Sequence, residues 1–143
     1  MSDHQRKTIR DKVGDVLTTA VPLVSSKVFV NRPNPLWTPP PKCLCVYFGS
    51  EEAREENVSE YIYIREIPII IEAVVQVSGA NAETVDDELD EIALQVEQAI
   101  KNSSNLSGEV MGIVLRRTEP AQTVVGKNIY GNLALEFVAT YSF

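Results

Sequence analysis

The sequence predicts an α+β fold: a two-layer sandwich with two helices packed on one face of a mostly antiparallel or mixed sheet of about five strands. Two observations predict it. Apolar residues recur at helical spacing in two stretches and alternate at period two in several others. A helix with one apolar stripe and a sheet with one apolar face bury both surfaces when they pack together. The 143 residues suit a single domain over residues 1–143.

The first predicted element is an amphipathic helix over residues 3–20. Its apolar positions share one face: Ile9, Val13, Val16, Leu17 and Ala20. Pro22 is expected to end it, because proline has no N–H and disfavours a helical residue before it. A short strand over 27–30 follows, then a stiff proline-rich loop over 31–42 and a strand over 43–48.

The longest predicted strand, or bent pair of strands, covers residues 61–77. One face is apolar at period two: Ile67, Ile69, Ile71, Ala73, Val75 and Val77. The opposite face is mixed, neither fully polar nor fully apolar: Pro68, Ile70, Glu72, Val74 and Gln76. Because Pro68 cannot donate a ladder hydrogen bond, we expect this stretch to lie at a sheet edge or to carry a bulge there.

A second amphipathic helix is predicted over residues 82–102. Its apolar stripe consists of Val85, Leu89, Ile92, Ala93, Val96, Ala99 and Ile100. Asn81 can cap this helix, or Thr84 and Asp87 can form a capping box. The remaining elements are two strands and the polar loop between them: 110–117, 118–132 and 133–143.

The composition limits the classes of partner. Lys and Arg number 13 and Asp and Glu 20, which gives a formal charge of −7. Such a chain lacks the basic surface that neutralises phosphates, although an acidic wall can line a channel through which DNA passes. No segment has the pattern of a signal peptide or a membrane span, so we expect synthesis in a reducing cytoplasm and no membrane partner. Cys43 and Cys45 are expected to be buried free thiols.

We assign no catalytic, metal-binding or cofactor-binding residue, and we expect the chain not to be an enzyme. His4 is the one histidine, no phosphate-binding glycine loop is present, and the acidic run over 86–91 is expected to be a solvated helix face. Two features have open alternatives. Arg116 and Arg117 either pair with acidic segments or contact a neighbouring subunit. Trp37, in the proline loop, either docks on a partner or covers the chain's own core.

The order of several motifs carries a family resemblance. The motifs are Val28-Phe29-Val30-Asn31-Arg32-Pro33, the strand Cys43 to Phe48, Glu51-Glu52, Ile71-Glu72-Ala73-Val74-Val75, Asp86-Asp87-Glu88-Leu89-Asp90 and Phe137-Val138-Ala139-Thr140-Tyr141. Over nearly the whole chain, this order resembles the tail terminator family of long-tailed bacteriophages. That family includes minor tail protein U of lambdoid phages and its prophage relatives.

The resemblance implies a structural role in virion assembly. Six copies would form a ring on the tail tube protein, stop tube polymerisation and present a surface to the head connector, while DNA passes through the lumen without specific binding. Assembly would take place in the host bacterial cytoplasm, and the ring would then belong to the virion tail. Alternatives are another neck or tube-related protein, and a small hydrolase or regulatory domain. Our interface candidates are Arg32, Trp37, Glu51, Glu52, Pro68, Ile70, Glu72, Val74, Arg116 and Arg117.

Overall fold

The computed structural model describes most of the chain: residues 5–24, 27–30, 42–50, 52–57, 62–78, 84–103, 106–108, 110–125 and 128–142. The helices are α1 (Gln5–Ala20) and α2 (Val85–Asn102), with short 3-10 turns η1 (Pro22–Val24) and η3 (Leu106–Gly108). The strands are β1 (Val28–Phe29), β2 (Lys42–Phe48), β3 (Glu52–Asn57), β4 (Ile62–Ser78), β5 (Gly112–Val125) and β6 (Asn128–Ser142).

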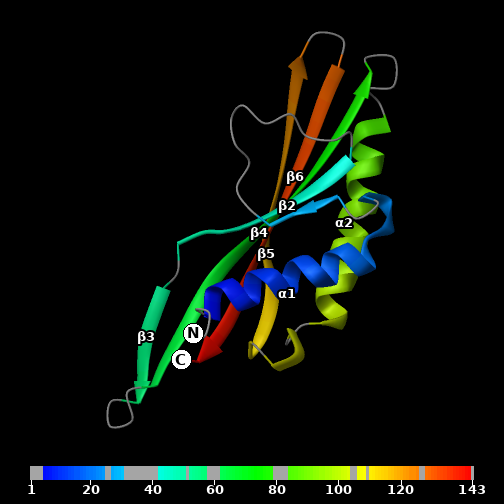
Figure 1. Ribbon diagram of the computed structural model, residues 1–143. Coiled ribbons are helices and arrows are strands. Elements are labelled where there is room, and N and C mark those ends of the chain that lie inside the picture. The colour runs from blue at the N-terminus through cyan, green and yellow to red at the C-terminus, as the bar shows by residue number, and fades with distance from the viewer. Residues whose placement is uncertain are drawn as a thin grey trace.

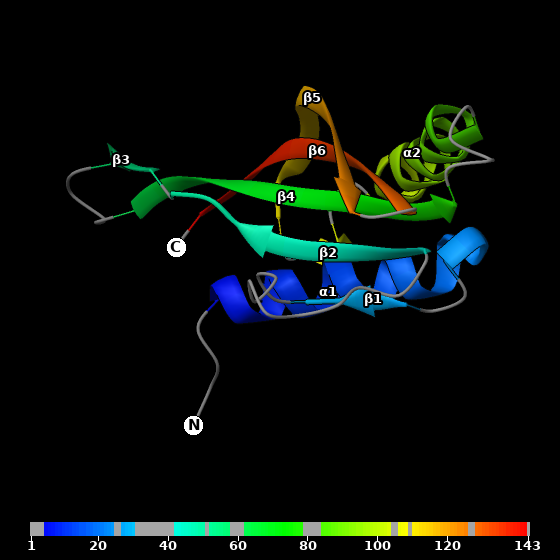
Figure 2. The same ribbon diagram turned by 90° about the horizontal axis from the view of Figure 1, so that it is seen from above.

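These strands form one mixed sheet in the order β1-β2-β4-β6-β5, with β3 pairing with β4 beyond the end of β2. The pair of β1 and β2 is parallel, and the other pairs are antiparallel. Figures 1 and 2 show β3 at one end of the molecule and the β5–β6 hairpin rising toward the other. The predicted α+β sandwich is therefore confirmed.

The core lies between the sheet and the two helices. Both helices contribute to one cluster with the same face of β4 and β6, so they cover that face together. The core positions of these elements are Ile9, Val13, Leu17, Val85, Leu89, Ile92, Ala93, Val96, Ala99, Ile100, Ile67, Ile69, Ile71, Ala73, Val75, Leu133, Leu135, Phe137, Ala139 and Tyr141. The stripe predicted for the second helix is fully buried. In α1, Ala20 is exposed instead, because it lies in the last turn.

Two glycines allow close approaches between the layers. A Cβ on Gly131 of β6 would clash with Val85 Cγ1 and lie 2.9 Å from Leu89 Cδ1, so the start of α2 rests directly on the strand backbone. A Cβ on Gly14 of α1 would lie 2.5 Å from Val30 Cγ2. All of these approaches are closer than van der Waals contact, so larger residues at either position would force the neighbouring side chains and the helix to move.

Pro68 does not lie at an edge, which corrects our expectation. β4 is a central strand, and its register with β6 continues through the pair of Pro68 and Val138 without a bulge. The Pro68 carbonyl accepts a hydrogen bond from Gly49 N at 2.9 Å, on the side of β4 that faces β2. Because N and C=O of one antiparallel residue point to the same side, the missing N–H faces the junction where β2 ends and β3 begins.

One strand was not predicted from the sequence, and the predicted final loop differs from expectation. Residues 52–57 form the strand β3, although their composition disfavours a strand. The predicted loop 118–132 is mostly strand, because β5 and β6 form a long hairpin that pairs from Gly112↔Thr140 to Val125↔Asn128. A bulge interrupts this pairing between Leu115 and Arg117.

The start of α2 differs in its cap. Thr84 occupies the N-cap position with φ −89° and ψ −10°, and its side chain makes no capping hydrogen bond. The predicted capping box is therefore wrong, because a side chain caps from extended backbone and Thr84 is already helical. The alternative cap, Asn81, lies outside the described residues. Three acidic residues in the first turn, Asp86, Asp87 and Glu88, complement the helix dipole there.

Candidate interaction surfaces

The face of the sheet opposite the helices is the first candidate, which we call the open face. Its centre is a row of register partners, Tyr47 of β2, Ile70 of β4 and Glu136 of β6, flanked on β4 by Pro68 and Glu72. All five are partly buried, and neither described helix lies over them. The mixed character that the sequence predicts for this face is confirmed.

Glu72 ties three strands together on the open face. Tyr47 Oη donates a hydrogen bond to Glu72 Oε2 at 3.2 Å, and Asn132 Nδ2 donates one to Glu72 Oε1 at 3.0 Å. Both carboxylate oxygens therefore have donors, from β2 on one side and β6 on the other. A partly buried network with its acceptors satisfied fixes side-chain positions, so this surface is held in one shape.

Val74 lies on the same face but offers almost no surface. It is 5% exposed and belongs to a small cluster with Cys43 and Cys45, covered partly by Phe29 and Tyr130. Its candidacy as a contact residue is therefore corrected: it packs beneath the face. The two cysteines are buried free thiols, as predicted. The hydrogen bond shared with Cys43, together with burial, raises the pKa of the Cys45 thiol, so this thiol is unreactive.

Arg116 and Arg117 converge on Glu136. Arg116 binds it with two nitrogens, Nε to Oε2 at 3.1 Å and Nη2 to Oε1 at 3.0 Å, and Arg117 Nη2 adds a contact of 3.3 Å to Oε2. The bulge in β5 permits this, because it places both consecutive arginines within reach of one carboxylate. The Arg116 hydrogen bond, with the charges of both arginines, lowers the pKa of Glu136.

The ion-pair partner of the two arginines is therefore not one of the acidic segments that we predicted. The arginines pair with Glu136 on the neighbouring strand, and Arg117 Nε also lies 3.5 Å from Glu119 Oε1. The Glu136 side chain is 13% exposed, whereas those of Arg116 and Arg117 are 53% and 60% exposed. Glu136 thus holds the two arginine side chains in place while more than half of each remains exposed.

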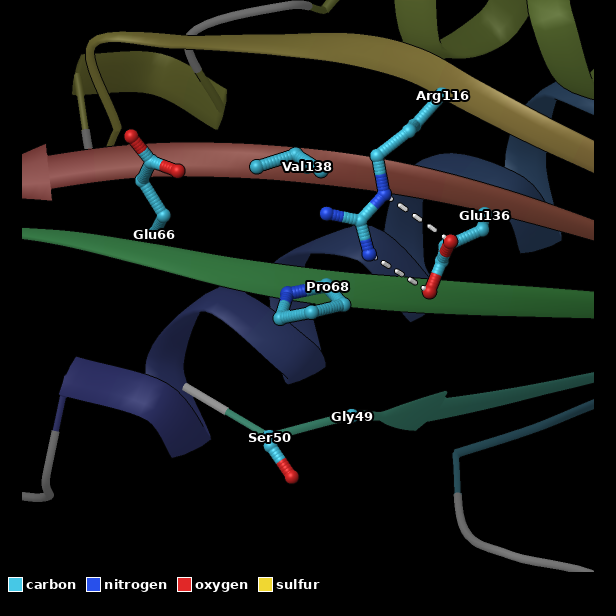
Figure 3. A pocket seen from close by; sticks show the side chains of 7 residues that line it. All are labelled: Gly49, Ser50, Glu66, Pro68, Arg116, Glu136 and Val138. Atoms are coloured by element: carbon cyan, nitrogen blue, oxygen red, sulfur yellow. Dashed lines mark hydrogen bonds and ion pairs between the residues drawn. The ribbon is translucent and has the colours of Figure 1, made fainter. Parts of the chain in front are cut away.

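A depression of about 250 Å³ lies beside this ion pair on the open face. Figure 3 shows Arg116 and Glu136 next to Pro68, with Glu66 and Ser50 at the rim. Glu136 is bound by two arginines, which makes it a poor general base. The depression therefore supports a shaped polar contact. It brings Pro68 and Arg116, predicted separately from the sequence, into one site.

A second surface was missed by sequence reasoning, and we call it the α2–β5 patch. It consists of three exposed large apolar side chains, Leu94, Met111 and Leu115, and a groove of about 310 Å³ that Leu115 helps to line. Val114 is also exposed, but it pairs with Val138 and lies on the open face. The groove is lined by Glu97, Ile100 and Lys101 of α2, Ile113 and Leu115 of β5, and Phe137 of β6. In the sequence, Met111 and Leu115 belong to what looks like an ordinary strand, so no local signal marks them as exposed. Leu94 lies off the predicted apolar stripe of its helix.

The remaining candidates cannot be placed. Arg32, Trp37 and Glu51 lie outside the described residues, and Glu52 is described only as backbone of β3. Within the described part of the chain, no three His, Cys, Asp or Glu side chains are grouped to hold a metal ion. No helix in that part is both long and apolar enough to cross a bilayer.

Comparisons with known proteins give structural likenesses but no family. No protein-family model matches the chain, and no curated protein matches it. One chain in the solved structure of the virion of a native gene transfer agent particle superposes with a TM-score of 0.46 at 11% identity. The superposition covers 92% of this chain and 94% of that one. A likeness of this extent carries no argument about what this chain does.

Proposed function

We propose that this chain is a structural subunit of a phage-type tail that closes with its own copies into a ring, terminates the tail tube and offers a surface to the head connector. The sequence resemblance to the tail terminator family suggests this role. The observation that carries it is the open face, where a hydrogen-bonded network around Glu72 fixes a mixed polar and apolar surface that no described helix covers.

A ring places a definite demand on such a subunit. Head-to-tail contacts close into a ring only when each copy has two different, complementary patches. The open face around Pro68, Ile70 and Glu72 supplies one candidate patch, and the exposed guanidinium groups of Arg116 and Arg117 mark the sheet edge beside it. Both are built on paired strands and not on loops, which favours a reproducible geometry.

The net charge of −7 fits a conduit for DNA. Like charge between a lumen wall and phosphates prevents sticking, so the nucleic acid passes without a specific contact. The same charge makes free subunits repel one another at low ionic strength, and screening by salt weakens that repulsion. We therefore expect rings to form more readily as salt or divalent cations are added.

The primary test is the mass of the purified protein as a function of protein and salt concentration. Analytical ultracentrifugation should show a monomer converting to one discrete larger species, and electron microscopy should show closed rings. Tubes of unlimited length would instead identify a tube-type subunit. A chain that stays monomeric under all ionic conditions and does not bind tail tubes would contradict the proposal.

The charge-reversal double variant Arg116→Glu with Arg117→Glu tests the edge. We expect it to abolish assembly, because four carboxylates, including Glu119 and Glu136, would then stand at the edge. Folding should survive, since the replaced side chains are more than half exposed, and circular dichroism checks this. A control with the same change in net charge is Lys12→Glu with Lys27→Glu on the α1 side of the molecule. Assembly equal to that control would remove the arginines from the contact.

A further inference from the structure

We propose that the α2–β5 patch is the surface through which one copy of this chain contacts the next. This inference rests on the proposed function and deepens it, because it locates one of the two patches that a ring requires. The occupant is a second copy, for the reasons of exposure, shape and charge that follow.

The patch concentrates the apolar exposure of the described residues. Leu94 is 55% exposed, Met111 67% and Leu115 42%. The one other exposed large apolar side chain in the described part of the chain is Val114, on the open face. Met111 and Leu115 lie within five consecutive positions at the start of β5. Scattered apolar residues on a surface need no explanation, but a cluster next to a groove indicates a contact site.

The groove gives the patch a shape. Ile100, Ile113 and Phe137 are buried or nearly so and line it together with Leu115. Glu97 and Lys101 line it on the α2 side, and Leu94 precedes them by three and seven residues, so it lies on the same face of the helix. A groove of about 310 Å³ is large enough to receive apolar side chains from a neighbour.

The exposure follows from the topology. β5 is the last strand of the sheet, and every residue from 114 to 121 is exposed on both faces of the strand. α2 packs mainly on β4 and β6 and reaches β5 near Ile113. The fold therefore leaves an apolar segment beyond its own helix layer, and none of the described residues covers it.

The local charge of the patch favours a second copy of the chain as its occupant. The charged side chains that line the groove are Glu97 and Lys101 of α2. Their charges cancel, whereas the whole chain carries −7. Two identical acidic molecules repel least where local charge is balanced, so copies can meet here. A nucleic acid would need a net positive surface, which this patch lacks.

The test compares Met111→Glu and Leu115→Glu with Thr19→Glu, an exposed position on α1 that receives the same charge. We expect each patch variant to raise the protein concentration at the midpoint of assembly by at least about tenfold, because a carboxylate would be buried in the contact. Thr19→Glu should leave the midpoint nearly unchanged. Sedimentation velocity at fixed salt measures the midpoint, and circular dichroism verifies folding.

Hydrogen exchange of the unmodified protein provides a readout that does not depend on any variant. On assembly, amides in 94–101 and 111–115 should exchange more slowly than in the free subunit. If rings form but these amides are unchanged and the variants assemble normally, the patch is wrong and the proposed function stands. If the unmodified protein never associates with itself, both are wrong.

Discussion

β4 and β5 belong to one sheet and both carry apolar side chains, but they differ in how much of those side chains the fold covers. β4 is paired on both sides along most of its length, and its alternate residues from Ile67 to Val75 are buried beneath the helices. β5 is paired on one side, and its residues from Val114 to Ala121 are exposed on both faces. Apolar residues thus stabilise the domain in one strand and are available for contacts in the other.

The difference teaches that position in the sheet decides the role of an apolar side chain. Ile71, fully buried, contributes its transfer free energy to folding, because water is removed from all of it. Leu115, 42% exposed, still has a large part of its surface in water after folding. That remaining surface can contribute only if a second molecule covers it.

The largest expected effect separates these two residues directly. Ile71→Ala should lower the free energy of unfolding by about 2–5 kcal/mol, because it leaves a cavity in a packed core. Leu115→Ala should lower it by less than about 1 kcal/mol. Urea unfolding of the monomer measures both. Equal losses would mean that β5 is as firmly part of the core as β4.

A second prediction concerns contact between α2 and the β5–β6 hairpin. Gly131→Ala should destabilise the protein by about 1–3 kcal/mol, because the new methyl would meet Val85 and Leu89 at the start of α2. Gly112→Ala in β5 is the matched control, since a Cβ there meets nothing within 4 Å. Its effect should stay within about 0.5 kcal/mol. If the control were as harmful as Gly131→Ala, close approach of the helix could not be the cause.

The smallest expected effect is the acid response of the ion pair between β5 and β6. In the folded chain, Arg116 and Arg117 hold the pKa of Glu136 below its ordinary value of 4.5. A lowered folded pKa gives stability that is present above the unfolded value and is lost as the pH falls through the folded one. Below about pH 4.5, the wild type should therefore lose stability more steeply than Glu136→Gln.

Thermal unfolding of the two proteins at stepped pH values measures this difference. Glu119→Gln is a suitable control, because its side chain is 64% exposed and exposed ion pairs contribute little. Parallel curves for wild type and Glu136→Gln would show that the two arginines do not couple Glu136 to folding.

Much of the fold could be predicted, because a buried face repeats its apolar residues at the period of the helix or strand that carries it. The stripe of α2 and the alternation from Ile67 to Val75 arise from one covered face, and both predictions are confirmed. β3 and the outer half of β5 show no such period in the sequence. β3 is a strand by virtue of its pairing with β4, which overrides its acidic composition. Residues 114–121 of β5 are exposed on both faces, so no alternation marks them. The glycine, asparagine and small polar residues of 118–132 gave that segment the pattern of a loop.

The candidate surfaces were predicted in part for the same reason. The sequence placed Pro68, Ile70 and Glu72 on one face of a strand, because period two follows from strand geometry. It could not show that Arg116 and Pro68 line the same depression, because β6 separates β4 from β5. The bulge in β5 and the length of the arginine side chain bring the two residues to one place. Nor could it show that Leu94 and Leu115 lie uncovered, because exposure depends on where the helix layer ends.

The irregular outer edge of β5 affects whether the protein aggregates at high concentration. A straight free strand invites a neighbour to add its own, and each addition exposes a fresh edge for the next. Here the irregular pairing at Leu115–Arg117 bends the backbone, and Pro120 lacks an amide hydrogen. Unassembled subunits should thus stay dispersed in solution instead of adding strand to strand into fibres. Contacts between subunits then depend on side chains, which limit the number of neighbours.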